Sequence, residues 1–581
     1  MNSTSKSRLF ALLCVPILLL CVFATYPVAE IGMNDEWSYV QSAEVLARTG
    51  HIVYNGWATA MLGWQLYIGA LFARLFGPSF TSIRASTVLV GLATAYLIHR
   101  TLVRVGITPR NAVIGTLAVV LGPLFLPLTV SFMTDIGGLF FIALCLYACL
   151  RAVEATEDRV VLGWLALAAI SNSLGGTVRQ IAWLGALVMF PCAVWLLRKR
   201  RHVVLLGLIL YPVSAAIIFG SLRWFQHQPY SVPEQLLPGP VALHNRHYLI
   251  GVGFRTLYTW ILYLLPLLLV FASALLWRER RTRLMLIFGG LLCVAVVLFL
   301  HHRHLLALFL SPVGNYVQLR HGFIDILQLD DDPGGRLAHA TQLVLVGVNL
   351  FAVLTFATFL ATVRVRRTSS SSLPAATSWW SLTVLLVPFT LAYLALLLPR
   401  AAFGGLYDRY LLPLVFLSVL VLTRLYQDRV KAKLPAYSLV LVAIFALYAM
   451  AGTYDSFSQA RAKLAAIAEL RAAGVPDTAI DAGLEHNAWV QVERYGYVND
   501  PRIKVPANLP RIEAPPFPDN CQPHADRQLT PAIVPGYTIS PDPAACAGPS
   551  GYSPVAYHGW LGFHTAYLYI VDTVKPSGRQ P

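Results

Sequence analysis

Charged residues are scarce in this sequence. Only 12% of the 581 residues are Asp, Glu, Lys or Arg, whereas soluble domains carry about 25%. Hydrophobic residues make up 57%, and the mean hydropathy is +0.62. This composition excludes a soluble globular protein. The net charge of +16 comes from short basic runs rather than from one basic face or tail, so we predict no nucleic-acid partner.

Long apolar runs are abundant instead. A helix needs about 20 apolar residues to cross the hydrocarbon layer of a membrane, and about thirteen runs of roughly that length occur. They lie near residues 8–28, 79–103, 110–130, 136–151, 160–176, 180–197, 203–222, 255–277, 284–301, 341–363, 378–398, 408–425 and 436–452.

Basic residues mark one side of these runs. With Lys6 and Arg8 inside, every second connection is basic, as in the cytoplasmic loops of membrane proteins. An odd number of spans places the C-terminus on the other side. We therefore predict an all-α, multi-pass protein of the inner (plasma) membrane with an extracytoplasmic C-terminus. A cleaved signal peptide over the first run is the alternative, although no small-residue cleavage site follows it cleanly.

The end of the chain differs from the rest. Residues 453–581 lack a long apolar run and hold 16 of the 36 prolines, so we predict a separate soluble domain after a membrane domain over 1–452. Apolar spacing predicts a helix over 454–473 and short strands over 478–481 and 566–571. The prediction is a small α/β domain.

The cysteines fall into two groups. Cys521 and Cys546 are the only two in the tail, and a disulfide between them is compatible with an oxidising compartment. The other six lie in or beside apolar runs, where we interpret them as small core residues.

Acidic residues near a membrane are costly and therefore informative. Several fall on the predicted outer side, including Asp35 and Glu36 in the outer loop 29–78. Because the topology was set from the inner basic loops alone, their convergence is a partly independent indication of one site. The candidate residues on this side are Asp35, Glu36, Tyr39, Asp135, Arg179, Tyr407, Asp408 and Arg409.

Structural roles are the alternative for each of them. An Asp-Glu pair in a loop is often a helix N-cap, Asp135 is placed to cap a helix, and Arg409 is placed to pair with Asp408. Position favours Asp35, because the residues after it have the spacing of an amphipathic helix on the membrane surface. The apolar positions of that helix are Trp37, Val40, Ala43 and Leu46. A second apolar stretch, 61–72, is predicted to lie in the interface.

These motifs, in this order, resemble the membrane glycosyltransferases of the C-type (GT-C) fold, in particular the protein O-mannosyltransferases and the lipid A aminoarabinose transferases. The similar elements are Asp35-Glu36 followed by Tyr39, Ala43 and Gly50; Leu75-Phe76-Gly77 with Arg84; Thr134-Asp135; and Asp408-Arg409-Tyr410-Leu411-Leu412-Pro413. Many relatives have a His-Pro-Pro or Lys-Pro-Pro turn in the first loop, whereas this chain has Asn55-Gly56-Trp57.

The resemblance implies transfer of a sugar, with inversion, from a polyprenyl-phosphate carrier to an extracytoplasmic hydroxyl of a protein, lipid or polysaccharide. Asp35 would be the general base. Glu36 and Asp135 would orient the base or the acceptor, and Arg179 and Arg409 would hold the lipid phosphate. Tyr39, Tyr407 and Asp408 would complete the binding site. A retaining route with two flanking carboxylates stays open.

Metal binding and two other functions are the alternatives to this interpretation. His301-His302-Arg303-His304 with His244 to His247, and Asp330 to Asp332, are the candidate metal ligands, but solvated or interfacial positions suit them better, so we assign no metal or other cofactor and leave a divalent cation open. A lipid-linked sugar flippase or transporter is disfavoured because no internal repeat occurs and mid-helix charges are few. A cell-envelope assembly factor, acting through its tail, is the remaining alternative.

Overall fold

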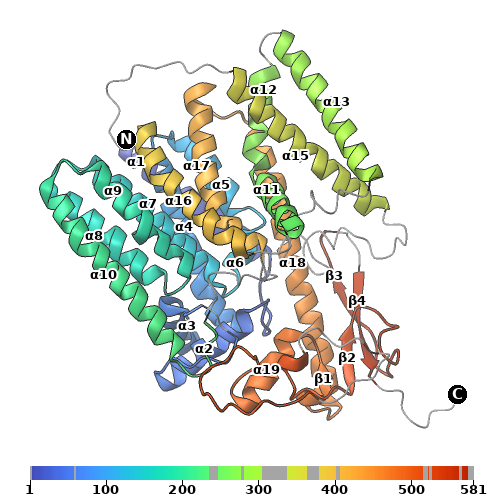
Figure 1. Ribbon diagram of the computed structural model, residues 1–581. Coiled ribbons are helices and arrows are strands. Elements are labelled where there is room, and N and C mark those ends of the chain that lie inside the picture. The colour runs from blue at the N-terminus through green and yellow to red at the C-terminus, as the bar shows by residue number, and fades with distance from the viewer. Residues whose placement is uncertain are drawn as a thin grey trace.

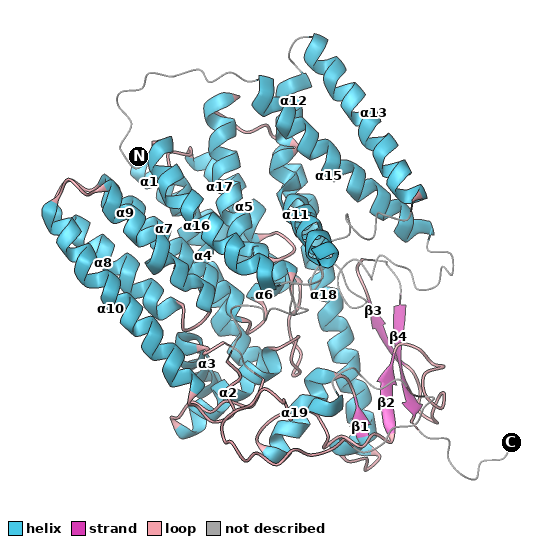
Figure 2. Cartoon of the chain, viewed as in Figure 1, coloured by secondary structure: helices cyan, strands magenta, loops and turns pink. Residues whose placement is uncertain are grey.

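The computed structural model describes residues 3–57, 60–233, 246–276, 280–303, 336–362, 378–400, 406–514, 521, 527–561 and 565–573. Most of this part is helical, and a small sheet lies near the C-terminal end (Figure 2). The predicted class, an all-α polytopic membrane protein with a small sheet-containing tail, is confirmed.

The helices form one large bundle with a long helix leading to the tail (Figure 1). They are α1 (Ser3–Ala24), α2 (Glu36–Thr49), α3 (Gly63–Phe76), α4 (Phe80–Arg104), α5 (Pro109–Val120), α6 (Phe125–Thr129), α7 (Thr134–Glu154), α8 (Asp158–Gly175), α9 (Phe190–Leu196), α10 (Arg201–Gln226), α11 (Arg246–Leu268), α12 (Val270–Leu276), α13 (Arg280–His302), α15 (Arg336–Thr362), α16 (Trp379–Arg400), α17 (Leu412–Arg429), α18 (Tyr437–Ala472) and α19 (Leu484–Tyr495).

Ten helices in the described part of the chain are long and apolar enough to cross a membrane. Several of the predicted runs are not single regular helices. The run 110–130 divides into α5 and α6, because Pro123 follows Gly122 and a proline disfavours helix in the residue before it. The run 180–197 consists of a 3-10 turn (Gln180–Ala182), a π-helical turn (Gly185–Met189) and α9.

The first outer loop folds into two helices. The predicted amphipathic helix after Asp35 is α2, and its expected apolar positions, Trp37, Val40, Ala43 and Leu46, are all buried. The second apolar stretch lies mostly in α3, which packs against α2. In Figure 1, α2, α3 and α19 lie at the same end of the bundle, so the loop meets the tail there.

The tail is built on α18, which continues without a break across residue 453. A four-stranded sheet packs against its second half in the order β1 (Ile480–Asp481), β2 (Tyr537–Ser540), β4 (Thr565–Asp572) and β3 (Val555–His558). β1 and β2 are parallel, with Ile480 opposite Tyr537, and the other pairs are antiparallel. Apolar residues of α18, including Ile467 and Leu470, share a core with the strands.

The tail elements match the predictions in part. The helix over 454–473 is the second half of α18, and the strand over 566–571 lies within β4. In the predicted strand 478–481 only β1 is extended, because Asp477–Ala479 forms a 3-10 turn.

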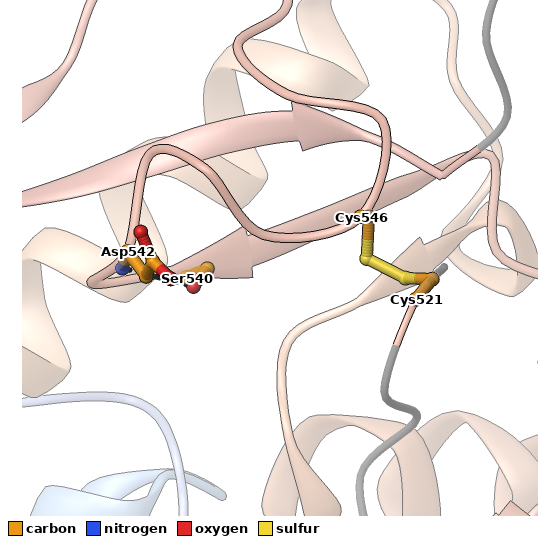
Figure 3. Close-up of a disulfide and its surroundings, with 4 residues drawn as sticks. All are labelled: Cys521, Ser540, Asp542 and Cys546. Atoms are coloured by element: carbon orange, nitrogen blue, oxygen red, sulfur yellow. Dashed lines mark hydrogen bonds between the residues drawn. A yellow bond between two sulfur atoms is a disulfide. The ribbon is translucent and has the colours of Figure 1, made fainter. Parts of the chain in front are cut away.

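The disulfide considered for the tail is present. Figure 3 shows Cys521 bonded to Cys546, beside the turn that holds Ser540 and Asp542. The six other cysteines are free thiols in or beside the apolar helices, as predicted.

Candidate active site

A cavity of about 470 Å³ lies where the first outer loop, α10, α16, the turn before α17 and the tail meet. One part of its wall is polar and rich in arginine, and the other part is apolar. The polar residues are Asn34, Asp35, Tyr39, Arg179, Gln180, Tyr393, Arg400, Tyr407, Arg409, Tyr410 and Arg502, and the apolar wall includes Trp57, Ile181, Trp183, Leu184, Leu187, Ile218, Leu222, Leu396 and Leu397.

Asp35 immediately precedes α2, but its side chain does not cap that helix. One carboxylate oxygen accepts a hydrogen bond from Arg409 Nη2 at 3.0 Å, and the other accepts one from Trp57 Nε1 at 3.0 Å. Asn34, with a φ of 65°, makes the sharp turn that places Asp35 at the cavity. The side chain of Asp35 is 19% exposed. The capping role therefore does not explain this residue.

Asp135 and Arg179 form a second pair. Asp135 lies in the first turn of α7 and is buried, and its Oδ1 is 3.0 Å from Nη2 of Arg179. Arg179 also donates to the hydroxyl of Thr134. Burial opposes the charge of Arg179, but the Asp135 carboxylate together with Tyr410 and Tyr393 outweighs burial, so the pKa of Arg179 is raised. Arg179 is therefore held as a cation in the cavity wall.

Tyr410 lies among three guanidinium groups. Its ring centre is 5.0 Å from Cζ of Arg179, 4.7 Å from Cζ of Arg400 and 5.6 Å from Cζ of Arg409. Attraction to the face of one aromatic ring helps to keep three like charges close together. A wall with several guanidinium groups is suited to bind an anion such as a phosphate, because each group offers paired donors.

The tyrosines of the predicted site remain neutral donors. Tyr39, on the first turns of α2, lines the cavity and is almost fully buried. Burial, reinforced by the Asp35 carboxylate, raises the pKa of Tyr39, and burial likewise raises the pKa of Tyr407. Both hydroxyl groups therefore keep their protons at neutral pH.

Three of the predicted site residues lie outside the cavity wall, and one of them, Asp135, meets the wall through its ion pair with Arg179. Glu36 is fully buried behind the cavity and forms an ion pair with Arg84 at 2.7 Å. Asp408 is also fully buried and accepts a hydrogen bond from the Tyr263 hydroxyl at 3.1 Å. Adjacency in sequence suggested that these acids share the site of their neighbours, but Glu36 and Asp408 point into the protein core.

Several residues of the cavity were not predicted, among them Arg400, Trp57 and Arg502. Arg400 ends α16 on the predicted outer side, where the positive-inside rule makes a basic residue unusual. That signal was present in the sequence. Trp57 and Arg502 carried no such signal, because one lies in an irregular loop and the other comes from the tail.

No group of three or more potential metal ligands occurs in the part of the chain that the structure describes. His301 and His302 end α13. His304, His244 and Asp330 to Asp332, which the sequence also suggested, lie outside the described residues.

Residues 64–224 match the sequence model of the dolichyl-phosphate-mannose-protein mannosyltransferase family. The predicted family resemblance is thereby confirmed. The matched segment contains Asp135 and Arg179, whereas Asp35 and Arg409 lie outside it. No curated protein sequence matches the chain.

Solved structures with distant similarity include two of ArnT from Cupriavidus metallidurans. The apo form is 14% identical, with a TM-score of 0.38 over 82% of each chain. The form bound to undecaprenyl phosphate is 14% identical, with a TM-score of 0.36 over 82% of this chain and 83% of that one. The Pmt1-Pmt2 complex of S. cerevisiae bound to the sugar donor is 14% identical, with a TM-score of 0.30 over 37% of this chain and 32% of the other.

Proposed function

We propose that this protein is a glycosyltransferase that moves a sugar, with inversion, from a polyprenyl-phosphate donor to a hydroxyl group on the outer side of the membrane. The observation that carries the proposal is the placement of Asp35 in a cavity whose wall also holds Arg179, Arg400 and Arg409. The cavity thus combines one base with several cations.

Asp35 acts as the general base in this reaction. It takes the proton of the acceptor hydroxyl while the acceptor oxygen bonds to the anomeric carbon and the bond from that carbon to the phosphate oxygen breaks. Polyprenyl phosphate leaves as an anion and needs little protonation. Arg179, Arg400 and Arg409 stabilise its charge, and Asp135 holds Arg179 in place.

Inversion is favoured by the number of carboxylates at the cavity. Among the described residues that line it, Asp35 is the only Asp or Glu. A retaining mechanism with a carboxylate nucleophile uses a second carboxyl group about 5 Å from the first. A single base suits direct displacement by the acceptor.

The donor lipid, the acceptor and the orientation belong to the same proposal. Polyprenyl chains reside in a membrane, and the apolar part of the cavity wall, with Leu184, Leu187 and Leu222, suits an isoprenoid segment. If the tail is extracytoplasmic, the cavity faces that side of the inner membrane, because Arg502 of the tail lines it. The experiment below identifies whether the acceptor is a protein, a lipid or a polysaccharide.

The test compares lipids and envelope glycans by mass spectrometry in the wild type, a deletion strain, and the deletion strain complemented with Asp35→Asn. Loss of a general base lowers the rate by about 10²- to 10⁴-fold, so a polyprenyl-phosphoryl sugar should accumulate and one glycan should lose that sugar in both mutants.

Asp428→Asn is the matched control. Asp428 also accepts hydrogen bonds from an arginine (Arg424, 2.7 Å) and an indole (Trp379, 3.0 Å), yet it does not line the cavity. This variant should restore the wild-type pattern. Unchanged lipids and glycans in the deletion strain would contradict the proposal and favour a flippase or an envelope assembly factor.

A further inference from the structure

The tail contacts the first outer loop beside the cavity. The backbone N–H of Val498 donates to the carbonyl of Asn55 at 2.9 Å, and the N–H of Gly56 donates to the carbonyl of Tyr230 at 2.9 Å. Tyr230, after α10, donates in turn to the carbonyl of Val505 at 2.8 Å. The turn Asn55-Gly56-Trp57 is therefore bonded to the tail both directly and through Tyr230.

The tail packs tightly against this turn. A Cβ atom on Gly56 would lie 2.8 Å from Cδ1 of Ile503 and 2.9 Å from the carbonyl oxygen of Val498, and the φ of Gly56 is +85°. Only glycine meets both conditions without strain. The rings of Tyr230 and Tyr497 stack with their centres 5.0 Å apart. The close contact of the tail with this turn therefore requires a glycine at position 56.

The same turn is bonded to α2 on its other side. Asn55 is 1% exposed; its side chain accepts from the hydroxyl of Ser38 at 2.7 Å and donates to the carbonyl of Ser38 and to Oε1 of Gln41. Trp57 then donates its indole N–H to Asp35. Contacts therefore run without interruption from the tail through the turn to the candidate base.

We infer that tail segment 497–505 positions Asp35, with Gly56 and Trp57 as the positioning residues between them. This inference rests on the proposed function, because it takes Asp35 as the base. The segment also lines the cavity through Arg502, which is ion-paired with Asp500. The tail is thus part of the active site, and its docking determines how the carboxylate meets the acceptor hydroxyl.

Positioning of this kind affects catalysis strongly. A displacement of about 1 Å at a reacting group can cost on the order of 100-fold in rate. The inference also accounts for Asn55-Gly56-Trp57 in place of the proline turn of many relatives. Proline carries no N–H and cannot adopt a positive φ, so at position 56 it would remove both the hydrogen bond to Tyr230 and the backbone shape that admits the tail.

The first experiment measures hydrogen exchange in the full-length protein in lipid nanodiscs and does not depend on activity. Gly56→Ala should speed exchange at residues 34–39 and 53–57 by at least about tenfold, because it removes about 1.4 kcal/mol or more of local stability. Gly50→Ala is the matched control, since Gly50 lies in the same loop with a φ of +76° and its Cβ would meet no atom within 4 Å. Equal exchange in the two variants would overturn the inference.

The second experiment measures transfer by the same preparations, with the donor lipid extracted from the deletion strain as the probe. Trp57→Phe keeps an aromatic ring but removes the donor to Asp35, so kcat should fall about tenfold while KM for the donor changes less than about threefold. Gly56→Ala should lower kcat in the same way and Gly50→Ala should not.

The outcomes separate the two proposals. Unchanged kcat in Trp57→Phe and Gly56→Ala, with Asp35→Asn inactive, would overturn the positioning role and leave the proposed function intact. Full activity of Asp35→Asn would overturn the role of Asp35 as the base, whereas the exchange comparison would still decide whether the tail holds that carboxylate.

Discussion

Asp35 and Glu36 are neighbours in the sequence with opposite surroundings. Asp35 faces the cavity, and its carboxylate accepts hydrogen bonds from Arg409 and Trp57. Glu36 faces the layer behind the cavity and is completely buried. Both are ion-paired to an arginine, so an ion pair by itself does not distinguish a reactive carboxylate from a structural one.

The number of hydrogen bonds does distinguish them. An ionised carboxylate has about four acceptor positions. Glu36 fills them with Nε and Nη2 of Arg84 and with the backbone N–H groups of Met33 and Phe132. Asp35 accepts two hydrogen bonds from side chains and keeps acceptor positions toward the cavity. Glu36 thus joins the outer loop, α4 and the residues before α7, whereas Asp35 keeps room for the hydrogen bond from an acceptor hydroxyl that the proposed function requires.

Exchanging each acid for its amide sharpens this comparison and gives the largest effect on stability. Glu36→Gln leaves Arg84 as a buried cation without its counter-charge, which costs about 3–5 kcal/mol. The protein level and the melting temperature in detergent should fall steeply. Asp35→Asn should keep both, because its surroundings are partly solvated. A stable but inactive Glu36→Gln protein would show that Glu36 takes part in the chemistry after all.

The sequence predicted the position of most of the candidate residues, whereas their roles stay predictions. Asp35, Tyr39, Arg179, Tyr407 and Arg409 all line the cavity, because scarce polar residues on one side of a membrane protein have few other places to gather. Glu36 was grouped with Asp35 by adjacency alone. Its separation from Asp35 depends on Arg84, 48 residues further along the chain, which no local pattern reveals.

The fold was predictable where hydrophobic length decides it. Long apolar runs give helices because a membrane supplies no other partner for the backbone, whereas the division of the run 110–130 at Gly122 and Pro123 is a local effect that hydropathy ignores. The contact between the tail and the turn that holds Gly56 was not predictable, because Val498 and Asn55 lie far apart in the sequence.

His486 is buried, as Glu36 is, but it lacks the full set of hydrogen bonds that Glu36 makes. It lies in α19, and its Nε2 atom has no hydrogen-bond partner among the described residues. Burial lowers the pKa of His486 to about 4, below the ordinary value of about 6.5. The unfolded chain therefore binds a proton at higher pH than the folded one, so stability is full above the unfolded pKa and is lost as the pH falls from about 6.5 toward 4.

The expected loss between pH 7 and pH 5 is about 2 kcal/mol. Hydrogen exchange of α19 in the full-length protein at the two pH values measures it, with His486→Gln as the reference for all other titrating groups. The wild type should lose more protection than His486→Gln on going to pH 5. The same loss in both proteins would mean that His486 is accommodated as a cation.

Arg400 gives the smallest effect and tests whether the cavity needs guanidinium groups or only positive charge. Arg400→Lys keeps the charge but loses the planar group over Tyr410, a contact of about 1 kcal/mol. KM for the donor lipid should rise about fivefold, with kcat nearly unchanged. Arg198→Lys is the matched control, because Arg198 lies 4.1 Å from the ring centre of Trp195, outside the cavity wall. An equal KM in the two variants would mean that Arg400 acts as a charge alone. Arg400 would then differ from Arg84, which binds Glu36 through two nitrogens of its planar guanidinium group.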